Sequence, residues 1–377
     1  MRVLVLNAGS SSLKASVVDG NATAARTQVS WGSDASRAPD RGRGLADVIA
    51  AVEGAGVARG SVGAVGHRVV HGGPTFRAPV AIDDATLEAL DALSELAPLH
   101  NAVAVETIRA ARIALPHVTH VACFDTAFHA GLPEVAARYP LPTAWQTEWG
   151  IRRYGFHGLS VAWSLRRAGE LLDRPANDLR LVVAHLGSGC SVTAVAGGHS
   201  VRTSMGFTPL EGLMMGTRAG SIDAGIVLHL LRTSRATAEQ IDDALEHRSG
   251  LLGVSGTTSD VRDLITAADG GDAAARLALD MFVDRAAAGI AAVATGLDGL
   301  DALVFTAGIG EHAGGIRAAI VRQLRNMGIA GIDESESGTD RVIAAGPPAI
   351  LRIEAREDLV VAESVEALLR RATGDGR

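Results

Sequence analysis

The chain alternates short apolar runs with glycine-rich turns and longer amphipathic stretches, and this alternation predicts its elements. Residues 3–6 form an apolar run that ends in a turn at Asn7, and an alternating segment then continues to Asp19. This pattern predicts two strands joined by a turn. The polar, glycine- and arginine-rich residues 32–44 predict a loop. Apolar residues at helical spacing predict helices over residues 84–96, 272–294 and 363–371. Alternating strands and helices are typical of the α/β class.

The strand–turn–strand pattern of the N-terminus occurs again in the second half of the chain. His185 in HLGSGCS aligns with Asn7 in NAGSSSL, and apolar runs flank both turns. A second pair of segments, a strand that ends at Asp125 and a strand that ends at Thr306, has nearly the same separation. Two elements repeated in one order predict a duplicated domain.

Length and composition exclude several classes of protein. A chain of 377 residues favours two domains, and 47% apolar residues with 20% charged residues are typical of a globular protein. The net charge of −7 and the aromatic content of 3% argue against a nucleic-acid binder. Asp298, Asp301 and several glycines interrupt the apolar residues 286–310, so we expect no membrane span. Cys123 and Cys190 lie in apolar surroundings, and we expect buried thiols in a cytoplasmic protein.

The turn at residues 7–14 has the composition of a phosphate-binding loop. Its glycine lets the backbone approach a phosphate, and the hydroxyls of Ser10, Ser11 and Ser12 can donate to phosphate oxygens. It is not a P-loop, because GxxxxGK[ST] is absent and a strand follows the turn. A plain hairpin is the alternative, which the second copy of the turn disfavours. Lys14 is the only lysine of the chain, so its place in this turn reflects either function or chance.

Four more residues lie in motifs suited to an anionic substrate. Arg68 and Arg218 stand beside glycines, where a guanidinium fork binds phosphoryl oxygens well; an ordinary surface arginine is the alternative. His157 stands between an aromatic residue and a glycine, and either hydrogen-bonds a phosphoryl group or is packed in the interior. Asp125 ends a predicted strand, where its carboxylate could orient Mg²⁺, position an arginine or act as a base.

Seven motifs, in this order, resemble the acetate kinase family: NAGSSSLK, HRVVHGG, FDTAFH, YGFHG, HLGSG, MGFTPLEGLMMGTRAG and AGIGEH. The resemblance covers essentially the whole chain. It implies an α/β fold of duplicated actin-like (ribonuclease H-like) ATPase domains with an interdomain nucleotide cleft. The implied N-terminal domain comprises residues 1–127 plus 358–377, and the implied nucleotide-binding C-terminal domain comprises residues 128–357.

The same resemblance implies reversible phosphoryl transfer from ATP to acetate, which gives acetyl phosphate and ADP in a homodimeric enzyme. It implies Mg²⁺ as the cofactor, with Mn²⁺ as the alternative ion, held by Asn7 and Glu357. The implied catalytic residues are Arg68, Asp125, His157 and Arg218. The implied nucleotide-binding residues are Ser10, Ser12, Lys14, His185, Gly187, Ser188, Gly189, Asp260, Arg262, Gly308, Ile309, Gly310 and His312. The implied acetyl pocket is lined by Val70, Leu99, Phe156 and Pro209, with Arg68 beside it.

Transfer to acetate needs no strong base, because a carboxyl group with a pKa of about 4 is already ionised at neutral pH. The barrier lies in an anion that attacks a polyanion, so positive charge and alignment must supply most of the catalysis. We therefore expect direct in-line transfer, in which His157 is not phosphorylated.

Some positions depart from the family pattern. Ser188 and His312 stand where the family usually has asparagine, and Leu159 and Val161 replace a usual threonine and histidine. Further departures are Ala102, Ala219, Ser221 and Ala224. The residues of phosphoryl transfer are unchanged, so we expect activity, and the departures bear on nucleotide preference and turnover.

Three other functions compete with acetate kinase. A propionate or butyrate kinase differs only in pocket size, and one methylene is worth about 1–3 kcal/mol. A sugar kinase needs Asp125 as the general base for a hydroxyl group. A non-catalytic module binds ATP without transfer. The two arginines, with His157 and Glu357, favour the carboxylate kinase over the last two.

Overall fold

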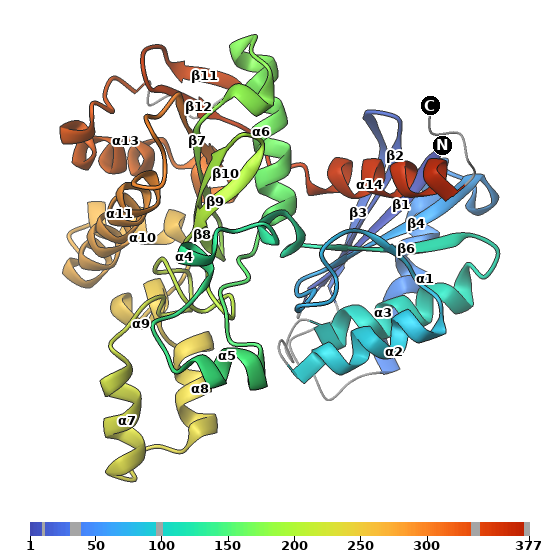
Figure 1. Ribbon diagram of the computed structural model, residues 1–377, viewed down its shortest axis with the longest axis horizontal. Coiled ribbons are helices and arrows are strands. Elements are labelled where there is room, and N and C mark those ends of the chain that lie inside the picture. The colour runs from blue at the N-terminus through green and yellow to red at the C-terminus, as the bar shows by residue number, and fades with distance from the viewer. Residues whose placement is uncertain (10–11, 31–38, 96–100, 333–339, 373–377) are drawn as a thin grey trace. The chain divides into compact units, whose positions relative to one another are not determined.

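The chain forms two compact units. The computed structural model describes residues 1–9, 12–30, 39–95, 101–332 and 340–372. Unit 1 comprises residues 1–130 and 356–377, and unit 2 comprises residues 131–355. The chain therefore begins in unit 1, builds all of unit 2 and returns to unit 1 at Arg356 (Figure 1).

Unit 1 is a six-stranded mixed sheet in the order β3-β2-β1-β4-β6-β5, covered by helices on both faces. The first three strands form an antiparallel meander, β4 and β6 continue the sheet in parallel, and β5 closes it antiparallel to β6. The strands are β1 (Arg2–Ala8), β2 (Ser12–Asp19), β3 (Ala22–Ser30), β4 (Val62–Val69), β5 (Val80–Ala81) and β6 (Thr119–Phe124). The helices are α1 (Pro39–Gly54), α2 (Asp84–Ala92), α3 (Asn101–Ala114) and α14 (Glu357–Ala372).

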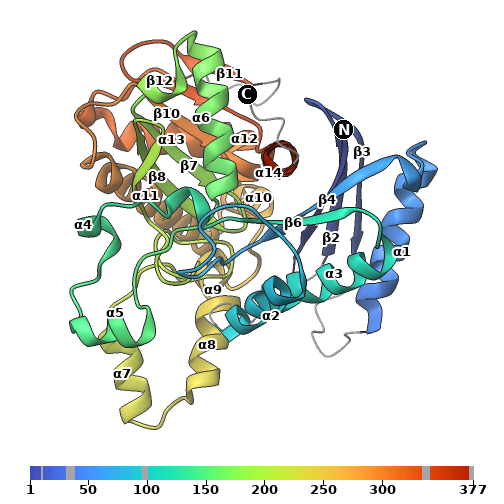
Figure 2. The same cartoon turned by 45° about the vertical axis from the view of Figure 1, so that its right-hand side comes forward.

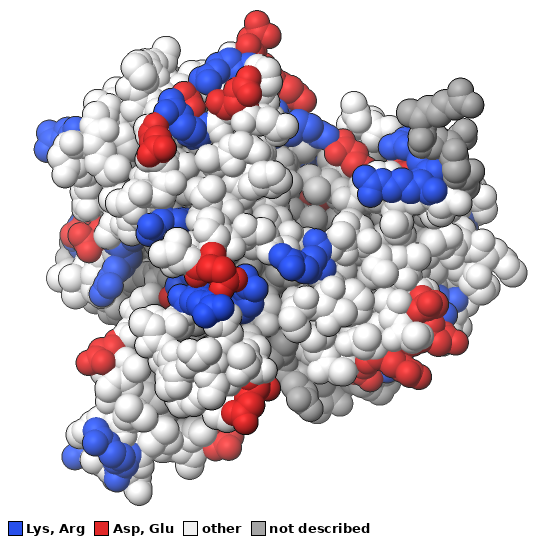
Figure 3. Space-filling model, in the orientation of Figure 1, with Lys and Arg blue, Asp and Glu red and all other residues white. Residues whose placement is uncertain are grey.

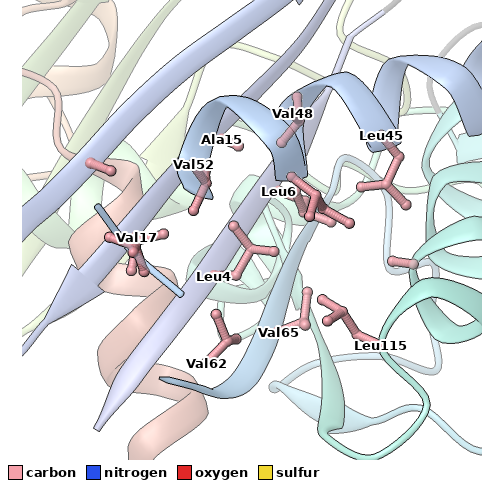
Figure 4. Packing of buried hydrophobic residues seen from close by; sticks show 14 of the residues in the cluster. Leu4, Leu6, Ala15, Val17, Leu45, Val48, Val52, Val62, Val65 and Leu115 are labelled. Atoms are coloured by element: carbon pink, nitrogen blue, oxygen red, sulfur yellow. The ribbon is translucent and has the colours of Figure 1, made fainter. Parts of the chain in front are cut away.

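The two faces of this sheet are buried by different helices. Leu4 and Leu6 of β1 pack with Leu45 and Val48 of α1 in one hydrophobic cluster (Figure 4). Successive residues of a strand point to opposite faces of the sheet, so the residues next to Leu4 and Leu6 in β1 point to the opposite face. On that other face lies α14, seen end-on in Figure 2, and a Cβ at Gly66 of β4 would collide with its valines.

Unit 2 repeats this strand plan. Its sheet has the order β9-β8-β7-β10-β12-β11, with a meander, two strands added in parallel and an antiparallel edge strand. The strands are β7 (Leu181–Leu186), β8 (Cys190–Ala196), β9 (His199–Thr203), β10 (Ala302–Thr306), β11 (Arg341–Ala344) and β12 (Ala349–Arg352). The helices are α4 (Glu134–Ala137), α5 (Thr143–Trp149), α6 (Gly158–Leu172), α7 (Ala224–Arg232), α8 (Ala238–His247), α9 (Gly250–Ser255), α10 (Val261–Asp269), α11 (Ala273–Ala294), α12 (Ala307–His312) and α13 (Gly314–Gln323).

The predicted α/β class and the predicted duplication are confirmed, since each unit carries the same six-strand topology. The hairpin at Asn7 and the hairpin at His185 are corresponding elements, as predicted. The second predicted pair was wrong. The strand that ends at Thr306 lies beside β7 and corresponds to β4, whereas the strand before Asp125 corresponds to β12. Equal spacing misled the alignment because helices α7–α11 lengthen the chain between β9 and β10.

The predicted helices exist with shifted ends. The helix expected over 84–96 ends as α2 at Ala92, and its N-cap Asp83 accepts a hydrogen bond from the Thr86 N–H. The helix expected over 272–294 is α11, and the C-terminal helix begins six residues earlier than predicted, at Glu357. The loop expected over 32–44 was wrong from residue 39 onward, because Pro39 starts α1 and proline is favoured in the first turn of a helix. Residues 32–38 lie outside the described residues.

The two cysteines are buried, as expected from the sequence. Basic and acidic side chains are interspersed over the face shown in Figure 3, without a broad region of one sign. Both cysteines are buried and unpaired by disulfides, and burial raises the pKa of each thiol to about 12. None of the helices in the described part of the chain combines the length and hydropathy that a membrane span requires.

Candidate active site

Arg68 is the centre of a polar cluster at the C-terminal end of the parallel strands of unit 1. It lies opposite Asn7 in the β1–β4 register, and Asp125 directly follows the neighbouring strand β6. Its Nε donates to Asp125 Oδ1 at 3.0 Å, and its Nη2 donates to Oδ2 at 2.5 Å. Its Nη1 donates to Asn7 Oδ1 at 3.0 Å, and Glu357 Oε2 lies 3.3 Å from Nε. The sheet and the first residue of α14 thus bring together four of the predicted residues: Asn7, Arg68, Asp125 and Glu357.

The electrostatics of this cluster keep the guanidinium charged. Burial lowers the pKa of Arg68, but the carboxylates of Asp125 and Glu357 outweigh it, so the pKa lies above its ordinary value. Asp125 is 1% exposed, and burial raises its pKa to about 6 although the Arg68 guanidinium lowers it. At neutral pH the pair is therefore ionised. Asp125, Asn7 and Glu357 hold the Arg68 guanidinium in one orientation. A guanidinium that is fixed in this way can bind an anion with a defined geometry.

The remaining predicted residues of unit 1 surround this cluster less closely. Lys14 is exposed on β2 and lies opposite Asn7 in the β1–β2 register. Ser12 is half-buried, and Val70 is buried directly after β4. Ser10 and Leu99 lie outside the described residues.

His157 and His185 form a stacked pair in unit 2. Their ring centroids are 3.9 Å apart and their planes differ by 15°. The Nδ1 atom of His157 lies 3.0 Å from the Ser191 hydroxyl, and that of His185 lies 2.9 Å from the Ser160 hydroxyl. His157 has a φ of 58° and precedes the first residue of α6. Such a conformation is costly for a residue with a side chain, and it is typical of functional sites.

Arg218 lies close to this histidine pair. Its Nε donates to Glu246 Oε2 at 2.7 Å, which fixes the guanidinium. A Cβ placed on Gly189 would lie 3.3 Å from His157 Nε2 and 3.7 Å from Arg218 Nη1. The backbone of Gly189 therefore lies close to both side chains, and a larger residue there would press on the His157 ring. Unit 2 thus brings together His157, His185, Arg218 and the predicted glycine loop.

The predicted nucleotide-binding loops of unit 2 are ordered by backbone hydrogen bonds. The Gly187 N–H donates to the carbonyl of Gly189 at 3.0 Å, and the Gly216 N–H donates to the carbonyl of Ser188 at 3.2 Å. The segment 307–312 is the short helix α12, which contains Gly308, Ile309, Gly310 and His312. A Cβ on Gly308 would meet open space, so this position is accessible to a ligand.

Asp260 and Arg262 form a separate, exposed pair at the start of α10. Asp260 caps the helix by accepting from the Arg262 N–H at 2.9 Å, and its carboxylate pairs with the Arg262 guanidinium at 2.5 Å. The hydrogen bonds from Arg262 lower the pKa of Asp260 to about 2. Both side chains are thus held at the N-terminus of α10.

Several residues that build the site were missed from the sequence. Glu246, Ser160 and Ser191 hold Arg218, His185 and His157, respectively. The hairpin register could have indicated Ser191, because it lies opposite His185. Glu246 lies on α8, 28 positions after Arg218, which is in a loop, and no local pattern indicates this pair.

Comparisons with known proteins agree with these features. The model described as the acetokinase family matches residues 32–363. The acetate kinase of Deinococcus radiodurans is 43% identical over 392 aligned residues, with 98% of each chain covered. The structure of Porphyromonas gingivalis acetate kinase has a TM-score of 0.87 at 30% identity and covers 98% of this chain and 99% of its own. That of a propionate kinase from Francisella tularensis has a TM-score of 0.85 at 35% identity, with 96% and 98% covered.

Proposed function

The chain belongs to the acetokinase family, and from this membership we propose that it transfers the γ-phosphoryl group of ATP to acetate, giving acetyl phosphate and ADP. The activity is reversible, since an acyl phosphate can return its phosphoryl group to ADP. The observation that carries the proposal within the molecule is the fixed cluster of Arg68, Asp125, Asn7 and Glu357.

The bonding of Asp125 distinguishes this reaction from sugar phosphorylation. Both of its oxygens accept hydrogen bonds from Arg68, so the carboxylate positions an arginine and is poorly placed to remove a proton from a hydroxyl group. A carboxylate acceptor needs no base, because acetate is ionised at neutral pH. The reaction needs positive charge on the phosphoryl oxygens, and this is what an aligned guanidinium supplies.

In the proposed transfer Arg68 and Arg218 bind the moving phosphoryl group, and His157 hydrogen-bonds one of its oxygens. The acetate oxygen forms the new bond to phosphorus as the bond to the ADP oxygen breaks. No proton moves in this step. Because the transfer is direct, no phosphorylated enzyme forms; a phosphohistidine at residue 157 that forms and decays at the rate of turnover would contradict this.

Oxygen donors suited to Mg²⁺ lie in the same cluster. Magnesium prefers one or two carboxylates together with substrate phosphates and water, and Asn7 and Glu357 offer an amide oxygen and a carboxylate. Within the described residues, no group of three or more His, Cys, Asp or Glu side chains could hold a metal alone. The residues therefore fit an ion that binds with the nucleotide. When bound, Mg²⁺ would neutralise charge on the phosphate oxygens; Mn²⁺ is the alternative.

We assign nucleotide binding chiefly to the second domain, residues 128–357. The turn at residues 187–189 and the exposed Gly308 at the start of α12 bring backbone without side chains to the surface that we propose for the nucleotide. His185, Ser188, Asp260, Arg262, Ile309 and His312 complete the proposed set. The turn with Ser10, Ser12 and Lys14, in the other domain, contributes to phosphate binding.

The acyl group of the substrate is proposed to contact Val70, Leu99, Phe156 and Pro209. All three of these described side chains are apolar and buried: Phe156 is 1% exposed, and Val70 and Pro209 are also buried. Propionate and butyrate are the competing acceptors, and the similarity to a propionate kinase keeps propionate as the second candidate.

Trapping with hydroxylamine tests the activity and the acceptor together. Protein, Mg-ATP and acetate, propionate or butyrate are incubated with hydroxylamine, which converts acyl phosphates to coloured hydroxamates. We expect hydroxamate from acetate at the highest kcat/KM. Its absence with all three acids would overturn the proposal, and a higher kcat/KM with propionate would replace acetate as the substrate.

We also propose a homodimer in the cytoplasm. Ile222, Ile226, Leu228 and Leu231, on or beside α7, are 40–56% exposed, and α7 and α8 line a cavity of about 330 Å³. Apolar side chains exposed together on one helix are typical of a covered interface. Light scattering is expected to give twice the chain mass, and Ile226→Glu is expected to give monomers. The two free, buried thiols agree with a reducing compartment.

A further inference from the structure

A polar network in unit 2 holds the loop that carries Pro209. Arg153 donates through Nη1 to the carbonyls of Ser204 and Met205, each at 2.9 Å, and through Nη2 to Glu211 Oε1 at 2.7 Å. The next residue, Tyr154, donates its N–H to the carbonyl of Gly206 at 2.9 Å. Arg153 and Tyr154, which precede Phe156 and His157, are therefore hydrogen-bonded to both ends of the loop 204–211.

Tyr139 closes this network with a single hydroxyl group. Its O–H donates to Glu211 Oε2, and its oxygen accepts from the Phe207 N–H at 2.9 Å. The Arg153 guanidinium lies 5.2 Å from the centre of its ring. A Cβ at Gly206 would collide with both the hydroxyl and the Glu211 carboxylate, so the network packs directly on the backbone.

The two anchor points of the hydroxyl flank Pro209 symmetrically. Phe207 lies two residues before Pro209, and Glu211 lies two residues after it. A hydroxyl offers one donor and two acceptor sites, and Tyr139 uses the donor on one flank and an acceptor on the other. Burial raises the pKa of this phenol above its ordinary value, so it keeps its proton at neutral pH.

We propose that the Tyr139 hydroxyl is a specificity-determining positioning group that fixes both flanks of Pro209, a residue proposed to contact the acyl group. This inference rests on the proposed function, in which Pro209 and Phe156 face the acyl group. A pocket distinguishes one methylene by about 10–200-fold only when its walls cannot move apart. Loosening the loop allows a longer acid to enter while the nucleotide loops remain unchanged.

The chain offers a matched control, because it has two tyrosines. The hydroxyl of Tyr154 donates to the carbonyl of Gly150 at 3.0 Å, outside the 204–211 loop. Tyr139→Phe and Tyr154→Phe therefore each remove one oxygen from the same region, and only the first releases the loop. Glu211→Gln removes the charge that receives Tyr139 and Arg153 without shortening a side chain.

The test compares kcat/KM for propionate with kcat/KM for acetate in the hydroxamate assay. In Tyr139→Phe we expect this ratio to rise about threefold to tenfold through the carboxylate KM, while the KM for ATP stays within about twofold. Glu211→Gln is expected to change the ratio in the same direction, and Tyr154→Phe is expected to leave it unchanged. An unchanged ratio in Tyr139→Phe and Glu211→Gln, or an equal change in Tyr154→Phe, would overturn the inference.

Hydrogen exchange provides a second measurement that does not depend on activity. The amides of residues 204–211 are expected to exchange faster in Tyr139→Phe than in Tyr154→Phe or in the parent chain. Unchanged exchange would show that the hydroxyl does not hold the loop and would overturn the inference even if the parent chain phosphorylates acetate. A parent chain that forms no acyl phosphate would overturn the proposed function itself, and the role in specificity with it.

Discussion

In unit 1 the N–H of Asp125 donates to the carbonyl of Val69 at 3.0 Å, and in unit 2 the N–H of Ile353 donates to the carbonyl of Phe305 at the same distance. Both residues directly follow corresponding strands, β6 and β12. The same backbone position thus holds a buried carboxylate in one unit and a fully buried aliphatic side chain in the other. Duplication kept the backbone geometry, while the side chains at the strand ends diverged in charge.

The two arginines show the same divergence. Arg68 of unit 1 is held by Asp125, Asn7 and Glu357, whereas Arg218 of unit 2 has its ion pair with Glu246. The groups near Arg218 are the stacked pair of His157 and His185 and the glycine loop with Gly189. Arg68 therefore has three polar partners in unit 1, whereas one carboxylate, that of Glu246, restrains Arg218 in unit 2. Function lies in these grafted residues and not in the shared fold.

Removing the most restrained arginine should have the largest effect. Arg68→Ala is expected to lower kcat by about 10³–10⁵-fold, the range for arginines that stabilise phosphoryl transfer. Arg68→Lys should recover little, because an ammonium cannot reproduce the fork that Asp125 and Asn7 align. Steady-state kinetics measure both. Arg109→Ala, which removes an exposed pair with Asp91, is the control and should leave kcat unchanged; a kcat for Arg68→Ala within tenfold of the parent would contradict the assignment.

Removing the carboxylate partner of each arginine should lower the free energy of unfolding by different amounts in the two units. Asp125 is 1% exposed, and Asp125→Ala removes two charged hydrogen bonds to Arg68, which should cost about 3 kcal/mol of unfolding free energy. Glu246→Ala should cost less, about 1–2 kcal/mol, because its side chain is 12% exposed and water can replace it. Urea denaturation at pH 7.5 measures both. Equal losses would show that the two arginines are equally restrained.

Lowering the pH should protonate Asp125 in the unit 1 cluster at a higher pH than an ordinary aspartate. Burial raises the pKa of Asp125 from 3.8 to about 6, so the folded chain takes up a proton between about pH 4 and pH 6 before the unfolded chain does. The contribution of this group to stability therefore falls as pH rises through that window and is constant above it. Activity changes in the opposite direction, because protonated Asp125 no longer aligns Arg68.

We expect kcat to fall about tenfold per pH unit below pH 6 in the parent chain. In Asp125→Asn this limb should disappear, with a low and flat rate in its place. A limb with the same midpoint in the variant would assign it to another group, such as a histidine of unit 2.

We expect the smallest effects from substitutions in the two corresponding hairpins, β1–β2 and β7–β8. Ser191 lies opposite His185 as Lys14 lies opposite Asn7. Ser191→Ala removes the hydroxyl beside His157 Nδ1 and is expected to lower kcat by up to about tenfold, the value of one hydrogen bond. Lys14→Arg is expected to stay within about twofold of the parent, since the side chain is exposed and the charge is kept. A large loss in Lys14→Arg would show that the single lysine contacts the nucleotide.

The features that could be predicted from the sequence are those that depend on local patterns or on adjacent strands. Arg68 lies near the end of β4 and Asp125 directly follows β6, and the parallel pairing of these two strands brings both residues to the same edge of the sheet. The hairpins at Asn7 and His185 were recognisable because a turn and two flanking runs are local features. Long-range partners were not predictable: Glu246 reaches Arg218 only after helix α8 has packed, and the network of Tyr139 spans 72 positions to Glu211. The correspondence between β10 of unit 2 and β4 of unit 1 was missed because insertions changed the spacing between the two copies.

The most direct test of the account follows phosphorus in one reaction mixture. The parent chain, Mg-ATP and acetate are observed by ³¹P NMR without a trapping agent. We expect a new acyl phosphate resonance that grows at the rate at which ADP appears, and that is absent when acetate is omitted. ADP that appears together with inorganic phosphate alone, or no turnover despite nucleotide binding, would contradict transfer to a carboxylate.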